Sequence, residues 1–388
     1  MVFIFINMKN KKFSVRKFIN DIHLWLGLGS GIILFLVCLS GTILAFEHEI
    51  KDFFAEEVHV EVGTAKHSVE NLSKLLEESD QGFVTGVTLP DIETEPYVFT
   101  VKKDPKERRG SQIMVDPFTA SMHTIKKSGA DAFLMSMFRL HRWLLLDIPV
   151  GRPIVGVATI IFLVLSISGI VLWFPRKFKW KQFKRGFTIK TSANWKRINH
   201  DIHNTLGFYS CLFLVIMCIT GLCWSFDGYR EGLGNLMGAP IFNRSGPKIE
   251  TGALSKSENI TIDQAIALAN EKLDYEGELS VSLPNKKNNY YSFRKYNNNN
   301  WSPVTADRLY MDTGGEILFV DVFKDKPMNV KIASLIRPIH TGEVLGMFSK
   351  TLYFLACLIG TSLPITGTLI WWNKLKQKRK RKLGNPLV

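Results

Sequence analysis

The sequence predicts a mainly α-helical membrane protein. We expect a four-helix transmembrane bundle that arises from a parallel internal duplication and carries two small α+β domains outside the cytoplasm. Three observations lead to this fold class. The 388-residue chain has four long apolar runs, its basic residues gather at the ends of those runs, and its two halves share sequence motifs.

Each apolar run is long enough to cross a bilayer, since a hydrocarbon core about 30 Å thick takes about 20 helical residues. Only an occasional polar side chain interrupts the runs. The first run is too long for an ordinary signal peptide and lacks an Ala-x-Ala cleavage site, so we expect it to remain as a membrane anchor. The four runs are Leu24–Phe46, Val150–Phe174, Thr205–Phe226 and Leu345–Trp372.

The basic residues that give the chain its formal charge of +14 are placed as in a membrane protein. Lysine and arginine cluster in three regions, 9–17, 176–197 and 374–382, and the middle region contains no acidic residue. Such regions lie in the cytoplasm by the positive-inside rule. We therefore expect both termini inside and two long periplasmic connections. The charge is better explained by the lipid bilayer than by a nucleic-acid partner, and we predict no nucleic-acid binding.

The two halves of the chain repeat each other. The stretch "DIHLWLGLGSGIILFLVCLSG" at 21–41 aligns without a gap with "DIHNTLGFYSCLFLVIMCITG" at 201–221. Later, "FRLHRWLLL…SGIVLWFP" parallels "IRPIHTGEV…TGTLIWWN" with a slip of one or two residues. Because each copy starts and ends inside, the repeats are parallel rather than inverted.

The predicted organisation follows from these runs and repeats. It comprises a cytoplasmic N-terminus (1–19), a first transmembrane helix (20–47), a first external domain (48–130), an interfacial segment with the second helix (131–175), a basic cytoplasmic loop (176–198), a third helix (199–227), a second external domain (228–327), an interfacial segment with the fourth helix (328–373) and a basic cytoplasmic tail (374–388).

Each external connection has the pattern of one helix followed by strands. "SVENLSKLLEES" and "TIDQAIALANEKL" have helical apolar spacing, and the second opens with a threonine cap. The alternating segments "FVTGVTL", "PYVFTVKK", "YYSFRKY" and "RLYMDTGGEILFVD" predict antiparallel strands. Turn residues at "DPFTAS" and "DTGGE" predict a turn late in each set.

Four histidines lie at the predicted membrane edges. His23 and His203 stand at the cytoplasmic entrance of the first and third runs, whereas His141 and His340 precede the second and fourth runs on the outer side. A titratable residue in a membrane is costly and indicates function. Imidazole pairs ligate haem iron, and bundles hold such cofactors between facing helices. A contact with lipid headgroups is the alternative for any one of them.

The spacing favours two haems over one compact metal cluster. Gly41 lies eighteen residues after His23, about 27 Å along a helix, so these two residues belong to opposite leaflets. We expect His23 and His203 at an inner haem, and His141 and His340 at an outer one. A hydroxyl residue followed by glycine recurs in each run at the matching depths, where glycine would make room for a macrocycle; ordinary close helix packing is the alternative. These pairs are Ser40–Gly41, Ser168–Gly169, Thr220–Gly221 and Thr366–Gly367.

Other residues are candidates for supporting roles. Guanidinium groups match carboxylate geometry and could bind haem propionates, although interface anchoring explains basic residues equally. His48 could replace or supplement an outer ligand, and His200 is a weaker inner alternative. The arginine and lysine candidates are Arg139, Arg142 and Arg337 outside, and Arg16, Lys17 and Arg197 inside.

Several common sites are not predicted. The five cysteines all lie in apolar runs, so we expect free, buried thiols and no disulfides. "GLGSG" at 27–31 lies inside a membrane run with no preceding strand, which favours helix packing over nucleotide binding. We expect no catalytic residue beyond the cofactor ligands, and no NAD, flavin or ATP site.

These motifs together resemble the PepSY-associated transmembrane family of bacterial inner-membrane proteins, which includes ferric-siderophore reductases. The resemblance spans almost the whole chain and rests on "DIHLWLGL…LSGTILAFEHEI", "VDPFTAS", "FRLHRWLL…GRPIVG…SGIVLWFP", "DIHNTLGF…TGLCWSF" and "IRPIHTGEVLG…TGTLIWW". The external domains look like PepSY domains, although "DPFTAS" lacks the family's Gly-Glu and "DTGGE" lacks its proline.

The resemblance implies a haem-containing oxidoreductase of the inner membrane, with two b-type haems ligated by pairs of these histidines. Electrons from a quinol or a cytoplasmic reductase would cross the membrane and reduce a ferric siderophore or other iron chelate in the periplasm, which would release iron(II). The alternatives are a non-enzymatic PepSY scaffold that regulates a peptidase, and a dihaem conduit to another periplasmic acceptor.

Overall fold

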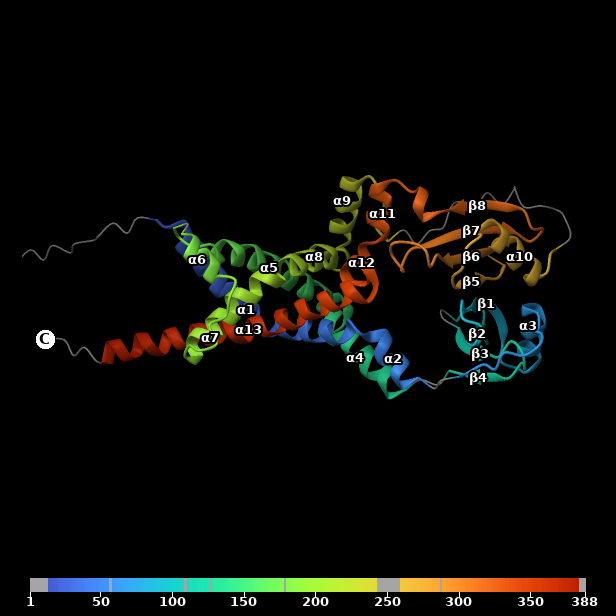
Figure 1. Ribbon diagram of the computed structural model, residues 1–388, viewed down its shortest axis with the longest axis horizontal. Coiled ribbons are helices and arrows are strands. Elements are labelled where there is room, and N and C mark those ends of the chain that lie inside the picture. The colour runs from blue at the N-terminus through green and yellow to red at the C-terminus, as the bar shows by residue number, and fades with distance from the viewer. Residues whose placement is uncertain are drawn as a thin grey trace, which may run out of the picture. The chain divides into compact units, whose positions relative to one another are not determined.

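The computed structural model describes residues 13–55, 58–107, 110–125, 128–177, 179–242, 259–286 and 288–383. The chain divides into two compact units. The bundle unit comprises Met1–Ala45, Met135–Tyr229 and Thr351–Val388, and the sheet unit comprises Phe46–Leu134 and Arg230–Lys350. Figure 1 shows both units.

Among the described residues, four helices are long and apolar enough to cross a membrane, as the sequence predicts. Their bounds differ from those of the apolar runs: the first helix begins nine residues before Leu24, so His23 lies within a regular helix rather than at its end. The helices are α1 (Val15–Leu44), α5 (Ile148–Trp173), the continuous span of α7 (Trp195–Asp201), η1 (Ile202–Leu206) and α8 (Gly207–Ser225), and α13 (Gly346–Leu383).

The long helices pack side by side through small and weakly polar residues (Figure 1). Leu34, Ala158 and Leu165 form an apolar cluster between α1 and α5. The Thr42 and Thr361 hydroxyls lie 3.4 Å apart between α1 and α13. Small residues let helices approach closely, which is how helices associate where lipid offers no hydrophobic driving force. The five cysteines are free, as predicted.

The basic connection between α5 and α7 is held by aromatic residues. It contains the short helix α6 (Trp180–Arg185). Trp173 stacks on Phe208 with ring centres 3.9 Å apart, and its indole N–H donates to the Gly186 carbonyl at 3.1 Å. The Thr205 hydroxyl donates to the same carbonyl. These contacts fix the connection against the bundle, and the Asn194 side chain caps the start of α7.

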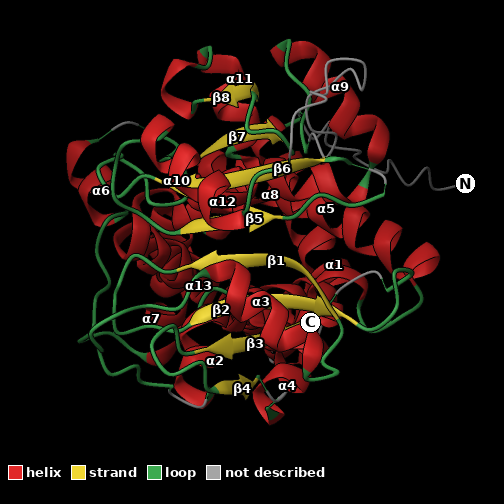
Figure 2. Cartoon of the chain, turned by 90° about the vertical axis from the view of Figure 1, so that its right-hand side faces the viewer, coloured by secondary structure: helices red, strands yellow, loops and turns green. Residues whose placement is uncertain are grey.

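The sheet unit contains a single antiparallel sheet of eight strands in the order β4-β3-β2-β1-β5-β6-β7-β8 (Figure 2). We expected two domains with separate sheets; instead β1 pairs with β5, with Val87 opposite Val281. Pairing removes two sheet edges whose backbone groups would otherwise be exposed. The strands are β1 (Phe83–Leu89), β2 (Tyr97–Lys102), β3 (Ser111–Val115), β4 (Met122–Thr124), β5 (Leu279–Ser282), β6 (Tyr290–Tyr296), β7 (Ala306–Asp312) and β8 (Ile317–Asp321).

Two helices, α3 (Val69–Glu78) and α10 (Ile262–Lys272), cover one face of this sheet (Figure 2). Both lie where the helical spacing predicts them, and Thr261 forms the predicted cap of α10. The Asp263 carboxylate of α10 accepts the backbone N–H groups of Val69 and Glu70 at 2.8 and 3.0 Å. This contact caps α3 from the other half of the sheet.

The predicted turns are present and each rests on an aspartate. Asp116 accepts the N–H of Phe118 at 2.8 Å in "DPFTAS", and Asp312 accepts the N–H of Glu316 at 2.7 Å in "DTGGE". The remaining helices are short. They are α2 (Glu47–Phe54), α4 (Gly129–Trp143), α9 (Asp227–Met237), η3 (Phe323–Asp325), α11 (Met328–Ser334), α12 (Ile336–Thr341) and η4 (Glu343–Leu345).

Candidate functional site

Two of the predicted histidines meet inside the bundle unit. His23 of α1 and His203 of η1 have ring centres 6.5 Å apart, and their ring planes are perpendicular, with an interplanar angle of 90°. Both lie at the end of the bundle that carries the basic connection and the C-terminal lysines. We call this arrangement the basic-end site.

Each ring is held by one hydroxyl group from a different helix of the bundle. His23 Nδ1 lies 2.8 Å from Ser168 Oγ of α5, and His203 Nδ1 lies 2.8 Å from Thr366 Oγ1 of α13. The Ser168 hydroxyl donates its proton to the Leu165 carbonyl of its own helix. The Thr366 hydroxyl donates its proton to its own helix in the same way.

These contacts determine the tautomer of both histidines. A hydroxyl that has donated its single proton can only accept from a neighbour. Nδ1 is therefore the protonated nitrogen of both His23 and His203. Their Nε2 atoms keep the lone pair, which is the form that binds a metal.

A local distortion of the backbone, which the sequence analysis did not predict, carries His203. The segment Ile202–Leu206 is one turn of π-helix between α7 and α8. Such turns are frequent at functional sites. Just before it, the fully buried Asn199 donates its side-chain N–H to the Thr366 carbonyl at 3.0 Å. Asn199 thus ties α7 to the same turn of α13 that holds His203.

The glycines after the hydroxyl residues make room for imidazole. A Cβ atom added at Gly367 would lie 3.2 Å from His203 Cε1, which is too close for relaxed packing. One added at Gly169 would lie 3.6 Å from His23 Cε1, an ordinary contact. In the structure each of these glycines lies against a histidine ring, and of the two only Gly367 is in tight contact with it. That glycine makes room for a macrocycle stays a prediction.

A cavity of about 550 Å³ adjoins both rings. That volume is within the usual range for small-molecule and cofactor sites. Leu34, Phe162 and Leu214 contribute apolar walls. Four cationic side chains also line it: Arg16, Lys17, Arg176 and Lys374.

Two of the predicted inner residues have other roles. Arg197 forms an ion pair with the buried Asp201 at 2.8 Å and does not line the cavity. His200 lines the cavity but is exposed, and its Nδ1 lies 3.6 Å from Asp201. Arg176 and Lys374 were not singled out from the sequence, although they lie in the two basic clusters that flank the apolar runs.

At the opposite end of the bundle, His141 has a related environment. Its Nδ1 donates to the Val37 carbonyl of α1 at 2.9 Å. A Cβ atom added at Gly41 would lie 3.0 Å from His141 Cε1, so the predicted match between these residues in depth is present. Burial lowers the pKa of His141, against the opposing effect of the Val37 carbonyl, and the nearby Arg142 lowers it further.

The sequence of the chain matches a known protein family. A family described as the PepSY-associated TM region matches residues 21–374, nearly the whole chain. The chain belongs to the PepSY-associated TM region family. Comparison with curated proteins finds no match.

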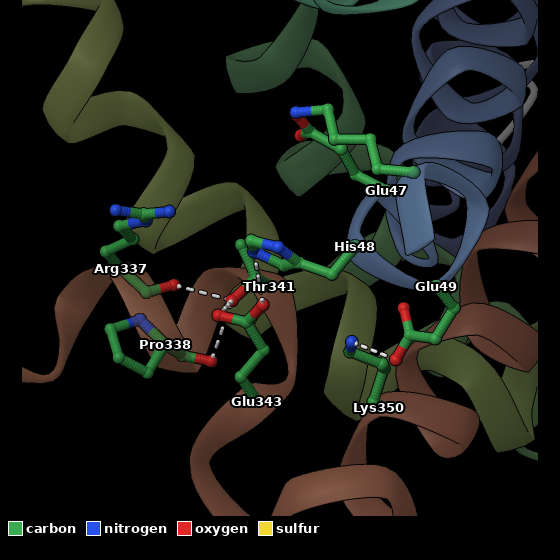
Figure 3. A network of polar contacts seen from close by, with 9 residues as sticks. Glu47, His48, Glu49, Arg337, Pro338, Thr341, Glu343 and Lys350 are labelled. Atoms are coloured by element: carbon green, nitrogen blue, oxygen red, sulfur yellow. Dashed lines mark hydrogen bonds and ion pairs between the residues drawn. The ribbon is translucent and has the colours of Figure 1, made fainter. Parts of the chain in front are cut away.

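The remaining candidates of this PepSY-associated chain belong largely to the sheet unit. His340 is half-buried on α12. His48 is exposed on α2, and its Nε2 lies 4.0 Å from Glu343, which also accepts the Thr341 hydroxyl at 2.9 Å (Figure 3). The exposed Arg337 points its guanidinium away from this network (Figure 3). The pairing of His141 with His340 or His48 stays a prediction.

The two outer arginines of the bundle unit are placed differently from each other. Arg139 is exposed on α4. The Arg142 guanidinium lies over the rings of Phe138 and Trp143, 5.6 Å from each ring centre. Burial lowers the pKa of Arg142, with a further contribution from the nearby Arg152. The predicted role of Arg139, Arg142 and Arg337 in binding propionates stays a prediction.

The geometry of the basic-end site defines what it can bind. Within the described ranges, no group of three or more His, Cys, Asp or Glu side chains could hold a metal ion. Metal–imidazole bonds of about 2 Å, with about 1 Å from each bonding nitrogen to its ring centre, place two rings about 6 Å apart on either side of one ion. The observed 6.5 Å fits that spacing. A metal ion held there would need its remaining donors from a group other than these side chains.

Proposed function

We propose that this protein binds haem at the basic-end site and transfers electrons across the membrane to a ferric chelate. The observation that carries the proposal is the pair of neighbouring histidines: two imidazoles, each held in the Nδ1–H form, with ring centres 6.5 Å apart beside a cavity of about 550 Å³. Two axial imidazoles are the protein ligands that an electron-transfer haem needs, because its macrocycle supplies the other four donors.

The residues around the pair suit such a group. Arg16, Lys17, Arg176 and Lys374 are cations at one end of the cavity lining, where haem propionates would need partners. The Arg16 guanidinium already donates to the Leu172 carbonyl at 2.6 Å, so it is held in place. Leu34, Phe162 and Leu214 would exclude water from the macrocycle. Bound haem supplies one-electron chemistry; the chain's own residues hold, orient and shield it.

A second haem at the other end of the bundle would complete the path. His141 is the ligand that the bundle unit offers there, with His340 as its proposed partner and His48 as the alternative. The contact of His141 with Gly41 places it about 27 Å of helix from His23, so one haem cannot serve both ends. Arg139 and Arg337 are the proposed propionate partners on that side.

The acceptor would be a ferric siderophore or similar iron chelate in the periplasm. One electron reduces iron(III) to iron(II), which a chelator with hard oxygen donors holds less tightly, so the metal is released. The donor would be a quinol or a cytoplasmic reductase. The family resemblance supports this assignment. Together with the basic clusters at the ends of the apolar runs, it supports a proposed location in the bacterial inner membrane with both termini in the cytoplasm.

Visible spectroscopy of the purified protein with and without dithionite tests the proposal. We expect a Soret band that shifts on reduction, and reoxidation of the reduced protein by ferric siderophores in stopped flow. A colourless protein would refute haem binding and favour the peptidase-regulating scaffold. Haem that ferric chelates fail to reoxidise would instead favour a conduit to another periplasmic acceptor.

A further inference from the structure

The perpendicular arrangement of the two imidazoles at the basic-end site has an identifiable cause. His23 and His203 come from α1 and η1, but the hydroxyls that hold them come from α5 and α13. Each ring is thus oriented by a helix other than its own. The resulting interplanar angle is 90°.

The two hydroxyls are themselves fixed. Ser168 and Thr366 are each only 9% exposed. Both donate to carbonyls of their own helices, at 3.1 Å for Ser168 and 3.0 Å for Thr366. Rotation of either imidazole about its Cβ–Cγ bond would break a hydrogen bond of 2.8 Å. The particular contribution of the hydroxyls is therefore the orientation of the two rings.

We infer that Ser168 and Thr366 are positioning residues that hold the two axial imidazoles of the bound haem in perpendicular planes. This inference rests on the proposed haem site. It assigns a role to the hydroxyl residues that is separate from ligation, because neither touches the metal. It also predicts a physical property of the cofactor that the identity of the ligands alone does not fix.

That property is the electronic symmetry of the ferric iron. Perpendicular imidazoles donate π density to two different iron d orbitals and leave these nearly equal in energy. A low-spin ferric haem of this kind gives a highly anisotropic electron paramagnetic resonance (EPR) signal with one dominant g value. Parallel imidazoles give a rhombic signal with three resolved g values instead.

The hydroxyls also affect the redox potential. An acceptor at Nδ1–H raises the basicity of the imidazole and stabilises iron(III). Removal of one acceptor should therefore raise the midpoint potential of the basic-end haem. This readout does not depend on activity with any iron chelate.

The test is low-temperature EPR of the oxidised full-length protein, with haem content measured first. The signal that disappears in His23→Ala belongs to the basic-end haem, and we expect it to be of the highly anisotropic type. Ser168→Ala and Thr366→Ala should retain haem, convert the signal towards the rhombic type and raise the potential. Ser168→Thr and Thr366→Ser keep a hydroxyl group at each position, so these variants should keep the wild-type EPR signal and midpoint potential.

Thr159→Ala is the matched control. Thr159 lies on α5, as Ser168 does, and donates its hydroxyl to the Val155 carbonyl of that helix at 2.8 Å, but it does not line the cavity. It should change neither the signal nor the potential. A rhombic basic-end signal in the wild type, or alanine variants with haem and unchanged EPR, overturns the inference. Absence of haem from the wild type overturns the proposed function first, so the two failures are distinguishable.

Discussion

The two ends of the bundle unit hold histidine in different ways. At the basic end, side-chain hydroxyls of neighbouring helices orient His23 and His203. At the opposite end, a backbone carbonyl of α1 orients His141. A hydroxyl can be changed by one substitution, whereas a carbonyl cannot. The basic-end site is therefore the one whose ligand geometry and potential a single side chain can tune.

The largest expected effect separates the two ends by haem content. His23→Ala and His203→Ala should each remove the basic-end haem, about half of the total, and His141→Ala should remove the other half. Removing an axial ligand leaves the macrocycle without one of its two protein bonds. Pyridine haemochrome assays against protein concentration measure this. His200→Ala is the control, since His200 pairs with Asp201 and should be dispensable. Unchanged haem in His23→Ala would refute the assignment.

Glycine substitutions should reveal a smaller, graded difference. Gly41→Ala and Gly367→Ala would bring Cβ within 3.0 and 3.2 Å of a histidine ring, so each should displace its ligand and lower haem occupancy. Gly169→Ala would bring Cβ only to 3.6 Å of His23 and should be tolerated. Titration of the three apoproteins with haemin checks the order. Equal loss in all three would show that the glycines act through general helix packing.

Charge removal beside the cavity should affect only the basic end. Arg176→Gln and Lys374→Gln each delete a cation that lines the cavity, which should weaken haem retention and lower the midpoint potential, because a nearby cation favours the reduced state. Lys376→Gln is the matched control: its ammonium lies over the Trp372 ring and does not line the cavity. Redox titration followed by visible spectroscopy compares them. A shift in Lys376→Gln equal to that in Lys374→Gln would contradict a local effect.

The smallest effect is expected in the sheet unit. Asp263→Ala removes the carboxylate that caps α3, which should lower the stability of that unit by about 1 kcal/mol. Haem content and the visible spectrum should stay unchanged. Thermal unfolding followed by circular dichroism measures the loss. An equal loss in Asp274→Ala, whose side chain lies outside this cap, would show that the cap is unimportant.

Much of the fold is readable from local patterns. The apolar runs predict the four long helices because a bilayer requires continuous apolar length. The alternation of apolar and polar residues predicts β1 and β6 at their observed bounds, and Thr261 marks the start of α10. The joining of β1 to β5 is not predictable in this way, because nothing local in either strand specifies its partner at the edge.

The candidate site, like the fold, was only partly predictable from the sequence. Sequence alone determined which histidines, hydroxyls and glycines recur, and their spacing placed His23 with Ser168, and His141 with Gly41, at matching depths. Tertiary structure decided which groups those residues contact: the hydroxyl accepts from imidazole, and the glycine lies against the imidazole ring. The π-helical turn at Ile202–Leu206 and the bond from Asn199 to Thr366 also emerged only there. The physical reason is that depth along a helix follows from residue count, whereas the direction of a side chain depends on the helices packed around it.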